Sequence, residues 1–532
     1  MEKTRLGMPI LLLNPPKPSL AFRGEVIVHA PLAACLTTGY IAASLQSRGL
    51  PVEVIEADLE LWGCEETAAA LREEKTFLLG VHLVYLWEET FQVLNLLKGL
   101  KEEGVATHLN LYGYYPTFAY EELLSSFPFV DSVTVGEPEF TFLELAQRLK
   151  TGKEWQNVQG LAWIERRTVR CNPARPLIDP LDQLPLPLRP SPELARRKGI
   201  TNYLLGSRGC TNHCSFCYLT PFYQGLRRWR GRSPDNIVAE MSRVLKETGL
   251  PDFYFADGNF FGPGQRGQRR AQELVKCIRE QGLSVHFGLE CCACDVQEET
   301  LSRLQEAGLT HLFIGIESGS EETLQCLRKN ITVDINERAI GIARRLGLKL
   351  STGFILFEPD ARLERVRESF EFLQRMDLLH TPSITAHLLH HSLVPLRGTE
   401  VFNRLASLGR LEVKSFTDYE GKSRFVDSRV EALAELMQEV CLKVLRNNRN
   451  GDYDSQENCY CIPKNGEGEK SLRLNTLVID VFSRALETLE RSQREAVYIE
   501  ELKGLKAQAL KELGNYGIGI IILPQRHKDH RD

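Results

Sequence analysis

The sequence predicts an α/β fold with an N-terminal doubly wound, Rossmann-like parallel sheet, a central parallel βα region and a C-terminal, mostly helical region. Three observations carry this prediction. Apolar runs alternate with helical patterns over the first 150 residues, the alternation resumes near Asn202, and the chain beyond residue 405 shows mainly helical periodicity. We therefore place the parts at 1–172, 173–200, 201–405 and 406–532, of which 173–200 is a proline-rich linker.

The N-terminal region contains five strand-like runs and two clear helical patterns. Strands are expected at 10–14, 52–56, 77–84, 109–112 and 130–135, and helices at 37–48 and 88–103. Ligands of such sheets bind at the carboxyl ends of the strands. Asn14-Pro15-Pro16 follows the first strand in place of the glycine fingerprint that dinucleotides need, so the sequence excludes the usual NAD site.

The composition is typical of a protein with ordinary hydrophobic cores in a reducing compartment. Of 532 residues, 43% are hydrophobic, and 65 basic residues face 70 acidic ones, a net charge of −5. This balance predicts neither a nucleic-acid partner nor an anionic membrane partner. No run reaches the roughly 20 apolar residues of a spanning helix. Fourteen cysteines without a secretion signal predict a cytoplasmic protein with free or metal-bound thiols.

The central region carries three cysteines, Cys210, Cys214 and Cys217, at Cys-x3-Cys-x2-Cys spacing. Three thiolates can hold three irons of a [4Fe–4S] cube and leave the fourth iron open for a substrate. A structural cluster normally takes four thiolates, and a structural zinc takes four Cys or His ligands. A zinc site with His213 as fourth ligand is the alternative, but His213 adjoins Cys214, and the two share one tetrahedral ion only with difficulty.

This cysteine loop resembles that of the radical S-adenosylmethionine (radical SAM) superfamily. The resemblance implies a partial (β/α)6 barrel, with the loop after its first strand at Tyr203–Gly206. It also implies that the open iron binds the amino and carboxylate groups of SAM, and that an electron from the cluster cleaves SAM to a 5′-deoxyadenosyl radical. The cysteine loop would then lie at the carboxyl mouth of the barrel.

Later strand ends extend the resemblance. Asp257 and Asn259 follow the second strand, Glu290 ends the third, and Glu317-Ser318 lies in a Gly-Ile-Glu-Ser-Gly-Ser strand end. The resemblance assigns Asp257 and Asn259 to the SAM amino group, and Glu317 and Ser318 to its ribose and carboxylate. A capping or salt-bridge role is the alternative for each acid. The predicted SAM-binding residues are Tyr218, Asp257, Asn259, Glu290, Glu317 and Ser318.

Four segments follow one another upstream of the cysteine loop, and they are Asn14-Pro15-Pro16, 31–45, 52–58 and 135–142. Together and in this order they resemble the cobalamin-binding domain that is fused to many radical SAM enzymes. The predicted cobalamin contacts are Asn14, Pro15, Pro16, Gly113, Gly136 and Glu137. The Asp-x-His-x-x-Gly motif of cobalamin mutases is absent, so the resemblance implies base-off cobalamin with no histidine below the metal. His29 is an alternative cobalt ligand, although a lone loop histidine is more often structural. The aromatic residues of 112–116 either line the corrin or pack the loop.

Three further groups carry expectations. Cys291, Cys292 and Cys294 are read as reduced, non-ligating thiols rather than as an auxiliary cluster. Ser233-Pro234-Asp235 predicts a helix start. Helices are expected at 430–445, 472–489 and 497–513. The arginines of the barrel's first loop favour a solvated loop or an anion contact, and they are Arg227, Arg228, Arg230 and Arg232.

The resemblance implies a cobalamin-dependent radical SAM methyltransferase that acts on an unactivated carbon of a small metabolite or a peptide. Its cofactors would be a [4Fe–4S] cluster, SAM and cobalamin, and its electron donor a flavodoxin or ferredoxin. A radical SAM cyclase or rearranging enzyme is the first alternative. A non-catalytic cobalamin or iron–sulfur sensor is the second. Methylthiotransferases are disfavoured because the residues before the linker hold only Cys35, Cys64 and Cys171, without the spaced cluster set of that family.

Overall fold

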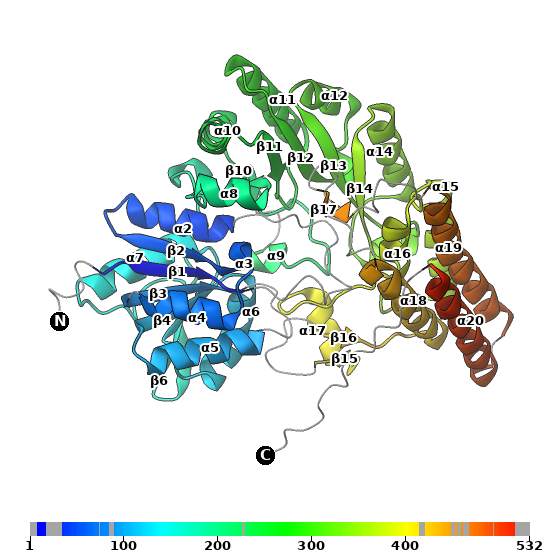
Figure 1. Cartoon of the computed structure of the whole chain (residues 1–532), viewed down its shortest axis with the longest axis horizontal. Helices are drawn as coiled ribbons and strands as arrows, with labels where there is room; N and C mark the ends of the chain where they lie inside the picture. The colour runs from blue at the N-terminus through cyan, green and yellow to red at the C-terminus, as the bar shows by residue number, and fades with distance from the viewer. Residues whose placement is uncertain are drawn as a thin grey trace. The chain divides into compact units, whose positions relative to one another are not determined.

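A computed structural model of the chain (Figure 1) describes residues 8–16, 35–73, 75–83, 90–225, 229–413, 421–447, 453–454, 459–460, 468–492 and 494–516. The chain divides into two compact units. The first comprises the described residues of 1–22, 30–353 and 394–424, and the second those of 354–393 and 425–532. His29, Arg227 and Arg228 lie outside the described residues.

The first unit contains the predicted doubly wound sheet. Its parallel strands follow the order β2-β1-β3-β4-β5, and a hairpin that the sequence did not predict extends the sheet antiparallel through β6 and β7. The topological switch therefore lies between β1 and β3, where open α/β sheets bind ligands. The strands are β1 (Ile10–Asn14), β2 (Val52–Glu56), β3 (Thr76–His82), β4 (Ala106–Tyr112), β5 (Ser132–Thr134), β6 (Leu161–Glu165) and β7 (Thr168–Cys171).

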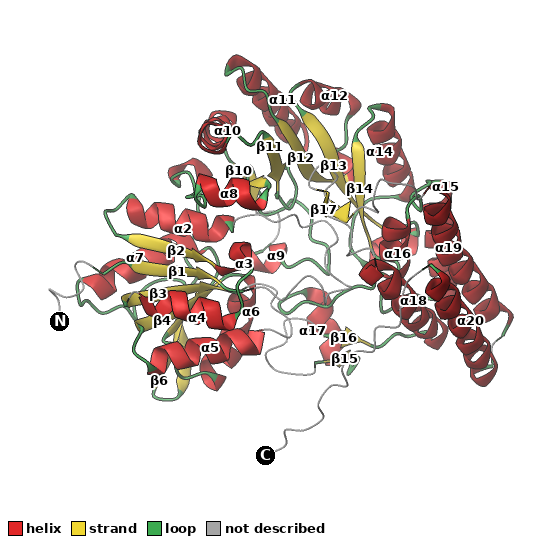
Figure 2. Cartoon of the chain, viewed as in Figure 1, coloured by secondary structure: helices red, strands yellow, loops and turns green. Residues whose placement is uncertain are grey.

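Helices cover both faces of this sheet (Figure 2). Alternate residues of β1 point to opposite faces. Ile10 and Leu12 pack in one core with residues of α2 and α7, and Leu11 and Leu13 in the other with residues of α4, α5 and α6. The helices are α2 (Leu36–Gln46), α3 (Ala57–Glu60), α4 (Cys64–Glu73), α5 (Thr90–Glu102), α6 (Tyr114–Ser126) and α7 (Pro138–Lys150).

A second sheet in the same unit has the order β14-β13-β12-β11-β8, so each strand neighbours the next one in sequence. This is the partial barrel that the sequence predicted, with five strands. Beyond them, in the second unit, a single parallel bridge joins Phe357 and Ser392. The strands are β8 (Asn202–Leu204), β11 (Asp252–Phe255), β12 (His286–Cys292), β13 (Leu309–Glu317) and β14 (Lys349–Phe354), with helices α10 (Pro234–Thr248), α11 (Gly264–Glu280), α12 (Glu298–Glu306), α13 (Glu321–Cys326) and α14 (Val333–Arg345) between them.

The start of α10 confirms one local prediction. Ser233 is the N-cap, and its hydroxyl accepts a hydrogen bond from the Asn236 N–H at 3.2 Å. Pro234 occupies the first turn, where its missing N–H costs nothing. The helix ends at Gly249, whose φ of 72° is left-handed and suits glycine.

Short elements connect these parts. They are η3 (Leu181–Gln183), α8 (Pro192–Lys198), β9 (Ser207–Arg208), α9 (Leu219–Phe222), β10 (Arg230–Gly231), η4 (Ala293–Asp295), α17 (Glu400–Ser407), β15 (Leu411–Glu412) and β16 (Lys422–Ser423). β9 pairs antiparallel with β10, and β15 with β16.

The second unit is mainly helical, which confirms the three helices predicted after residue 405. Helices α16, α18, α19 and α20 pack against one another (Figure 1). Its elements are α15 (Leu363–Arg375), α16 (Pro382–His390), α18 (Ser428–Asn447), β17 (Tyr453–Asp454), β18 (Cys459–Tyr460), α19 (Gly468–Arg491) and α20 (Glu495–Asn515). Among the described residues, no helix has the length and apolar content needed to cross a bilayer.

Candidate active site

The three motif cysteines lie on one loop between β9 and α9, and all three are half-buried. The Cys217 N–H donates to the Cys214 carbonyl at 3.1 Å, which closes the loop locally. Ser215 anchors it on both sides. Its N–H donates to the Leu327 carbonyl at 3.0 Å, and its carbonyl accepts from the Val401 N–H at 3.0 Å.

Burial raises the pKa of Cys214 to about 12 and that of Cys217 to about 11. The charges of Cys217 and Cys210 add to the effect at Cys214. In the metal-free chain these thiols keep their protons at neutral pH. A metal must therefore displace the protons when it binds, as thiolate coordination requires.

The β13 end holds Glu317 in a strained conformation. Its φ is +65°, and the Ser318 N–H donates to the Ile316 carbonyl at 2.9 Å, the pattern of the rare γ-turn with positive φ. Asn336 of α14 stabilises this turn, since its amide donates to the carbonyls of Ile316 and Ser318, both at 3.1 Å. Strain of this kind costs about 1–3 kcal/mol and is concentrated at functional sites.

Lys329 is a buried cation beside this turn, and the sequence did not identify it. Its Nζ lies 2.8 Å from Glu317 Oε1. Burial alone lowers the pKa of Lys329, but the charge of Glu317 outweighs burial and raises the pKa well above its usual value. The sulfurs of Cys214 and Cys292 add to this effect when they are thiolates. The ammonium group therefore stays charged next to the cysteine loop and the predicted SAM residues.

Asp257 lies fully buried just past β11 and holds the turn that leads into the cysteine loop. Its Oδ2 accepts from the Gly206 N–H at 3.0 Å, and its Oδ1 accepts from the Ser207 hydroxyl. Burial raises the pKa of Asp257 to about 6. The structure thus gives Asp257 two partners from the chain itself, and its predicted contact with SAM stays a prediction.

Asn259 and Glu290 lie at neighbouring strand ends, since the Phe260 N–H donates to the Glu290 carbonyl at 2.9 Å. The Asn259 amide donates to Asp295 Oδ2 at 2.7 Å, while its buried Oδ1 accepts no hydrogen bond from any described residue. Glu290 accepts from the Tyr254 hydroxyl at 3.1 Å, and burial raises its pKa to about 7. The Asn259 Oδ1, a buried acceptor without a donor among the described residues, fits a ligand that brings an ammonium or hydroxyl group, as SAM does.

Tyr218, immediately after the last motif cysteine, contacts the N-terminal sheet domain. Its ring centroid lies 4.4 Å from that of Tyr114, which also lies 4.4 Å from Phe222. Tyr112 and Tyr115 are buried in the core. In the 112–116 segment these aromatic residues therefore pack the fold and the cysteine loop, and contact with the corrin stays a prediction.

The predicted cobalamin residues gather at the carboxyl edge of the N-terminal sheet. Asn14 ends β1, and its side chain bonds Glu56 and Thr38, both at 2.6 Å. Gly113 follows β4 with φ +120°, and a β-carbon there would lie 2.4 Å from a backbone oxygen. Gly136 follows β5, and a β-carbon there would meet no described atom within 4 Å, so the backbone borders open space.

His82 ends β3 at the same edge and was missed by the sequence analysis. Its Nδ1 lies 3.2 Å from Cys35 Sγ. The Cys35 sulfur in turn accepts from the Thr38 hydroxyl at 3.4 Å. Pro15 and Pro16, which follow Asn14, are buried. Asn14 and His82 end β1 and β3, the strands that flank the topological switch, whereas Cys35 and Thr38 lie at the start of α2.

The Glu137 carboxylate is not free in its loop, because it lies in a buried network of ion pairs. Its Oε1 bonds Arg208 and Arg230, both at 3.0 Å, and its Oε2 accepts from the Ile178 N–H at 2.8 Å. Arg208 also bonds Glu139 at 2.6 Å. Burial raises the pKa of Glu137, but the charges of Arg208 and Arg230 hold it below its usual value.

This network corrects the expectation for the arginines that can be described. Arg230 and Arg232 are buried rather than solvated, because carboxylates pair with them. Arg232 bonds Glu240 at 2.6 Å and the Tyr40 hydroxyl at 3.1 Å. Both arginines therefore connect the first loop of the barrel to the N-terminal sheet domain. Their guanidinium groups pair with carboxylates of the chain rather than with solvent or an anionic ligand.

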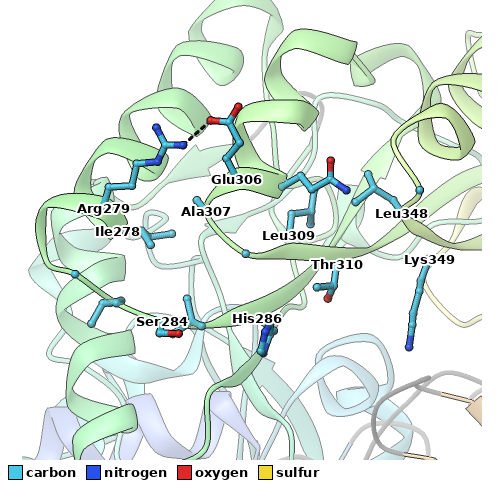
Figure 3. A pocket seen from close by; sticks show the side chains of 16 residues that line it. Ile278, Arg279, Ser284, His286, Glu306, Ala307, Leu309, Thr310, Leu348 and Lys349 are labelled. Atoms are coloured by element: carbon cyan, nitrogen blue, oxygen red, sulfur yellow. Dashed lines mark hydrogen bonds and ion pairs between the residues drawn. The ribbon is translucent and has the colours of Figure 1, made fainter.

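A surface hollow of about 680 Å³ lies at the opposite, amino-terminal end of the barrel strands (Figure 3). His286, Leu309 and Lys349, which line it, stand at the first positions of β12, β13 and β14. In parallel βα barrels this end serves stability, and the catalytic groups lie at the carboxyl end. The hollow is therefore not the candidate active site.

Comparisons with known proteins agree with this geometry. Residues 204–373 match the family model of the radical SAM superfamily. An uncharacterized methyltransferase of Pyrococcus horikoshii, PH0819, is 27% identical over 375 residues, which cover 70% of this chain and 79% of the relative.

Two solved structures share the fold. The cobalamin-dependent S-adenosylmethionine radical enzyme OxsB, with aqua-cobalamin and SAM bound, matches with a TM-score of 0.69 and 18% identity over 96% of this chain and 84% of that one. The radical SAM methyltransferase TsrM of Kitasatospora setae, with cobalamin and a [4Fe–4S] cluster bound, matches with a TM-score of 0.64 and 16% identity over 95% and 100%. Residues 204–373 are therefore a match to the radical SAM superfamily, and the chain shares the fold of cobalamin-dependent radical SAM enzymes.

Proposed function

We propose that this chain is a cobalamin-dependent radical SAM methyltransferase that methylates an unactivated carbon of a small metabolite or a peptide. One observation carries the proposal. The loop with the three motif cysteines and the carboxyl edge of the Rossmann-like sheet, where such sheets bind ligands, lie in one unit. They contact each other through the pairs Arg208–Glu137 and Tyr218–Tyr114. The relative PH0819 and the structural neighbour TsrM, both named as methyltransferases, support it.

The donor set fits the implied cofactors. Three thiols on one loop suit a cluster with an open iron, and the partnerless acceptor of Asn259 suits the SAM ammonium group. The open space at Gly136, next to the strand ends, suits a large ligand on the N-terminal edge. When bound, the cluster and SAM supply the 5′-deoxyadenosyl radical and cobalamin carries the methyl group.

The chain itself binds, orients and excludes water. Cys210, Cys214 and Cys217 hold the cluster. Glu317 and Ser318 meet SAM from the β13 turn, with Lys329 fixing the Glu317 carboxylate. Asp257 acts as a positioning residue, since it holds the Gly206–Ser207 turn before the cysteine loop.

Ligands outside the chain follow from this chemistry. Radical SAM enzymes need a one-electron reductant, and we propose a flavodoxin or ferredoxin for this role. The substrate would enter at the carboxyl mouth of the barrel, between the β12 and β13 ends and the N-terminal edge.

Product analysis tests the proposal. Protein reconstituted without oxygen is incubated with methyl-labelled SAM, a low-potential reductant, cobalamin and candidate substrates, with Cys214→Ala as the inactive control. Methyl transfer predicts label on a substrate carbon, with S-adenosylhomocysteine and 5′-deoxyadenosine rising in equal amounts. Substrate-dependent 5′-deoxyadenosine without label or S-adenosylhomocysteine would replace the proposal by a cyclase or rearranging enzyme. If the wild-type protein cleaved no SAM at all, the result would favour a non-catalytic cobalamin or iron–sulfur sensor.

A further inference from the structure

Two cysteines outside the cluster motif form a close pair at the mouth of the barrel. Cys292 ends β12, and Cys294 lies in the short turn η4 that follows. The Cys294 thiol donates to the Cys292 sulfur over only 3.0 Å. Cys292 is 4% exposed, whereas Cys294 is exposed. The pair thus has one sulfur open to solvent and one protected behind it.

A shared metal is a poor explanation of this geometry, although an Asp295 oxygen also lies within 4.8 Å of both sulfurs. Two thiolates on one tetrahedral zinc, each about 2.3 Å from the metal, lie roughly 3.8 Å apart. The observed pair is closer and still shares a proton. Asp295 already accepts the Asn259 amide, and the ammonium of Lys329 opposes a second cation.

We propose that Cys292 and Cys294 are a redox-active dithiol that closes to an intramolecular disulfide by exchange with a low-molecular-weight disulfide such as oxidised glutathione. The inference goes beyond the proposed function and does not depend on it, because the exchange requires neither SAM nor cobalamin.

Cys294, whose side chain is exposed, is the entry thiol, which means that it reacts first with the oxidant. The Cys294 proton moves across the 3.0 Å hydrogen bond to the Cys292 sulfur, and the Cys294 thiolate attacks one sulfur of the oxidant. The oxidant's S–S bond breaks, a mixed disulfide forms, and one glutathione thiolate leaves. Cys292 then gives its proton to that thiolate and attacks Cys294, which releases the second glutathione. The Cys292 thiolate and the Cys294 thiol together lose two electrons and one proton, and the oxidant becomes one glutathione thiol and one glutathione thiolate.

The residues around the pair favour both the formation and the reduction of the disulfide. The hydrogen bond between the two sulfurs lowers the pKa of Cys292 and raises that of Cys294, so the resting pair carries its negative charge on Cys292. The proton shift to Cys292 is therefore the step that frees the exposed Cys294 sulfur to attack. A disulfide between residues two apart closes a small ring, and strained or exposed disulfides are the easily reduced ones. Oxidation would remove an anionic neighbour from Lys329, whose other partner is Glu317.

The test uses the full chain, reconstituted with iron, in anaerobic glutathione buffers of opposite redox state. After alkylation, cleavage at Arg279 and Arg303 gives one peptide, 280–303, that contains Cys291, Cys292 and Cys294. We expect three alkyl groups on this peptide in reduced buffer. In oxidised buffer we expect one alkyl group, on Cys291, and a loss of two hydrogens. Three alkyl groups in both buffers would refute the dithiol.

Single variants test the assigned roles. Cys292→Ser should trap one glutathione on Cys294, whereas Cys294→Ser should trap none, because Cys292 is buried. Cys291→Ser is the matched control, and its pair should close as in the wild type. Equal trapping in the first two variants would overturn the entry role of Cys294. Loss of iron or of bound zinc from either variant would replace the dithiol by a metal site.

Discussion

Lys329 Nζ lies 2.8 Å from Glu317 Oε1, and both side chains are almost entirely buried, with 8% and 11% of their surface exposed. The two residues approach from different elements. Glu317 ends β13 in a left-handed conformation, and Lys329 lies between Arg328 and Asn330, which also have positive φ. A buried pair held by strained backbone is sensitive to the loss of either partner.

Lys329→Met should therefore destabilise the fold, because it leaves the Glu317 carboxylate buried and unpaired. Breaking a buried pair costs on the order of 3–5 kcal/mol. Chemical denaturation of the iron-free protein measures this. The double variant Lys329→Met/Glu317→Gln should regain most of the stability, yet bind SAM roughly ten- to a hundredfold more weakly than wild type, since charge-assisted hydrogen bonds contribute about 1.5–3 kcal/mol. Wild-type SAM affinity in the double variant would return both residues to a purely structural role.

The cluster should depend on three thiols only. Replacing Cys210, Cys214 or Cys217 singly with Ala is expected to abolish SAM cleavage and to lower the iron content of anaerobically reconstituted protein. The combined variant Cys291→Ser/Cys292→Ser/Cys294→Ser should keep close to four irons per chain, as a single [4Fe–4S] centre requires. If that variant lost as much iron as Cys214→Ala, the second cysteine group would hold metal.

Glu290 should make the iron-free protein less stable as pH rises. Its pKa is raised from 4.5 to about 7 in the folded chain, so its contribution to stability is complete below about pH 4.5 and is lost as pH rises through about 7. The shift corresponds to about 3 kcal/mol at most. Glu290→Gln should thus melt like wild type at pH 4.5 and several degrees higher at pH 8. A difference of the same size at both pH values would contradict the titration.

Bound cobalamin should be base-off, with no histidine below the metal. Among the described residues of the N-terminal sheet edge, His82 is the imidazole to test, and its Nδ1 already contacts the Cys35 sulfur. His82→Ala should leave the absorption and paramagnetic resonance spectra of the bound corrinoid unchanged. A nitrogen signal on cobalt that disappears in this variant would make His82 the ligand.

Sequence patterns predicted the two parallel sheets well because periodicity and motifs report local structure. The strands at 10–14 and 52–56 match β1 and β2 to the residue. The β6–β7 hairpin escaped notice because Leu161–Glu165 pairs antiparallel with a partner only three residues on, and its alternation is weak. The arginines near residue 230 were misjudged because their carboxylate partners, Glu137 and Glu240, lie at other points of the chain.

The sequence proposes site residues where the chemistry requires a motif. It does not reveal residues whose role comes from a tertiary contact. The three cysteines follow from spacing alone. Lys329 carries no such signal, because lysine is usually a surface residue, and only the folded chain brings it to Glu317. Asn336 stabilises the Glu317 turn from a helix position that reads as ordinary amphipathic sequence. Neither could be identified without the structure.

The ion network around Glu137 limits how far this protein can be treated as a set of interchangeable modules. Arg208 stands two residues before Cys210, and its guanidinium bonds Glu137 and Glu139 of the N-terminal sheet domain. A barrel excised at residue 201 would expose Arg208 and Arg230, and a foreign N-terminal domain without the two acids would bury them as unpaired cations. Recombination with a relative's N-terminal domain is therefore expected to yield iron-binding protein only when the incoming domain brings both acids. Domain exchange at this boundary must therefore treat four residues as one set, rather than only join two domains through a linker. These residues are Glu137, Glu139, Arg208 and Arg230.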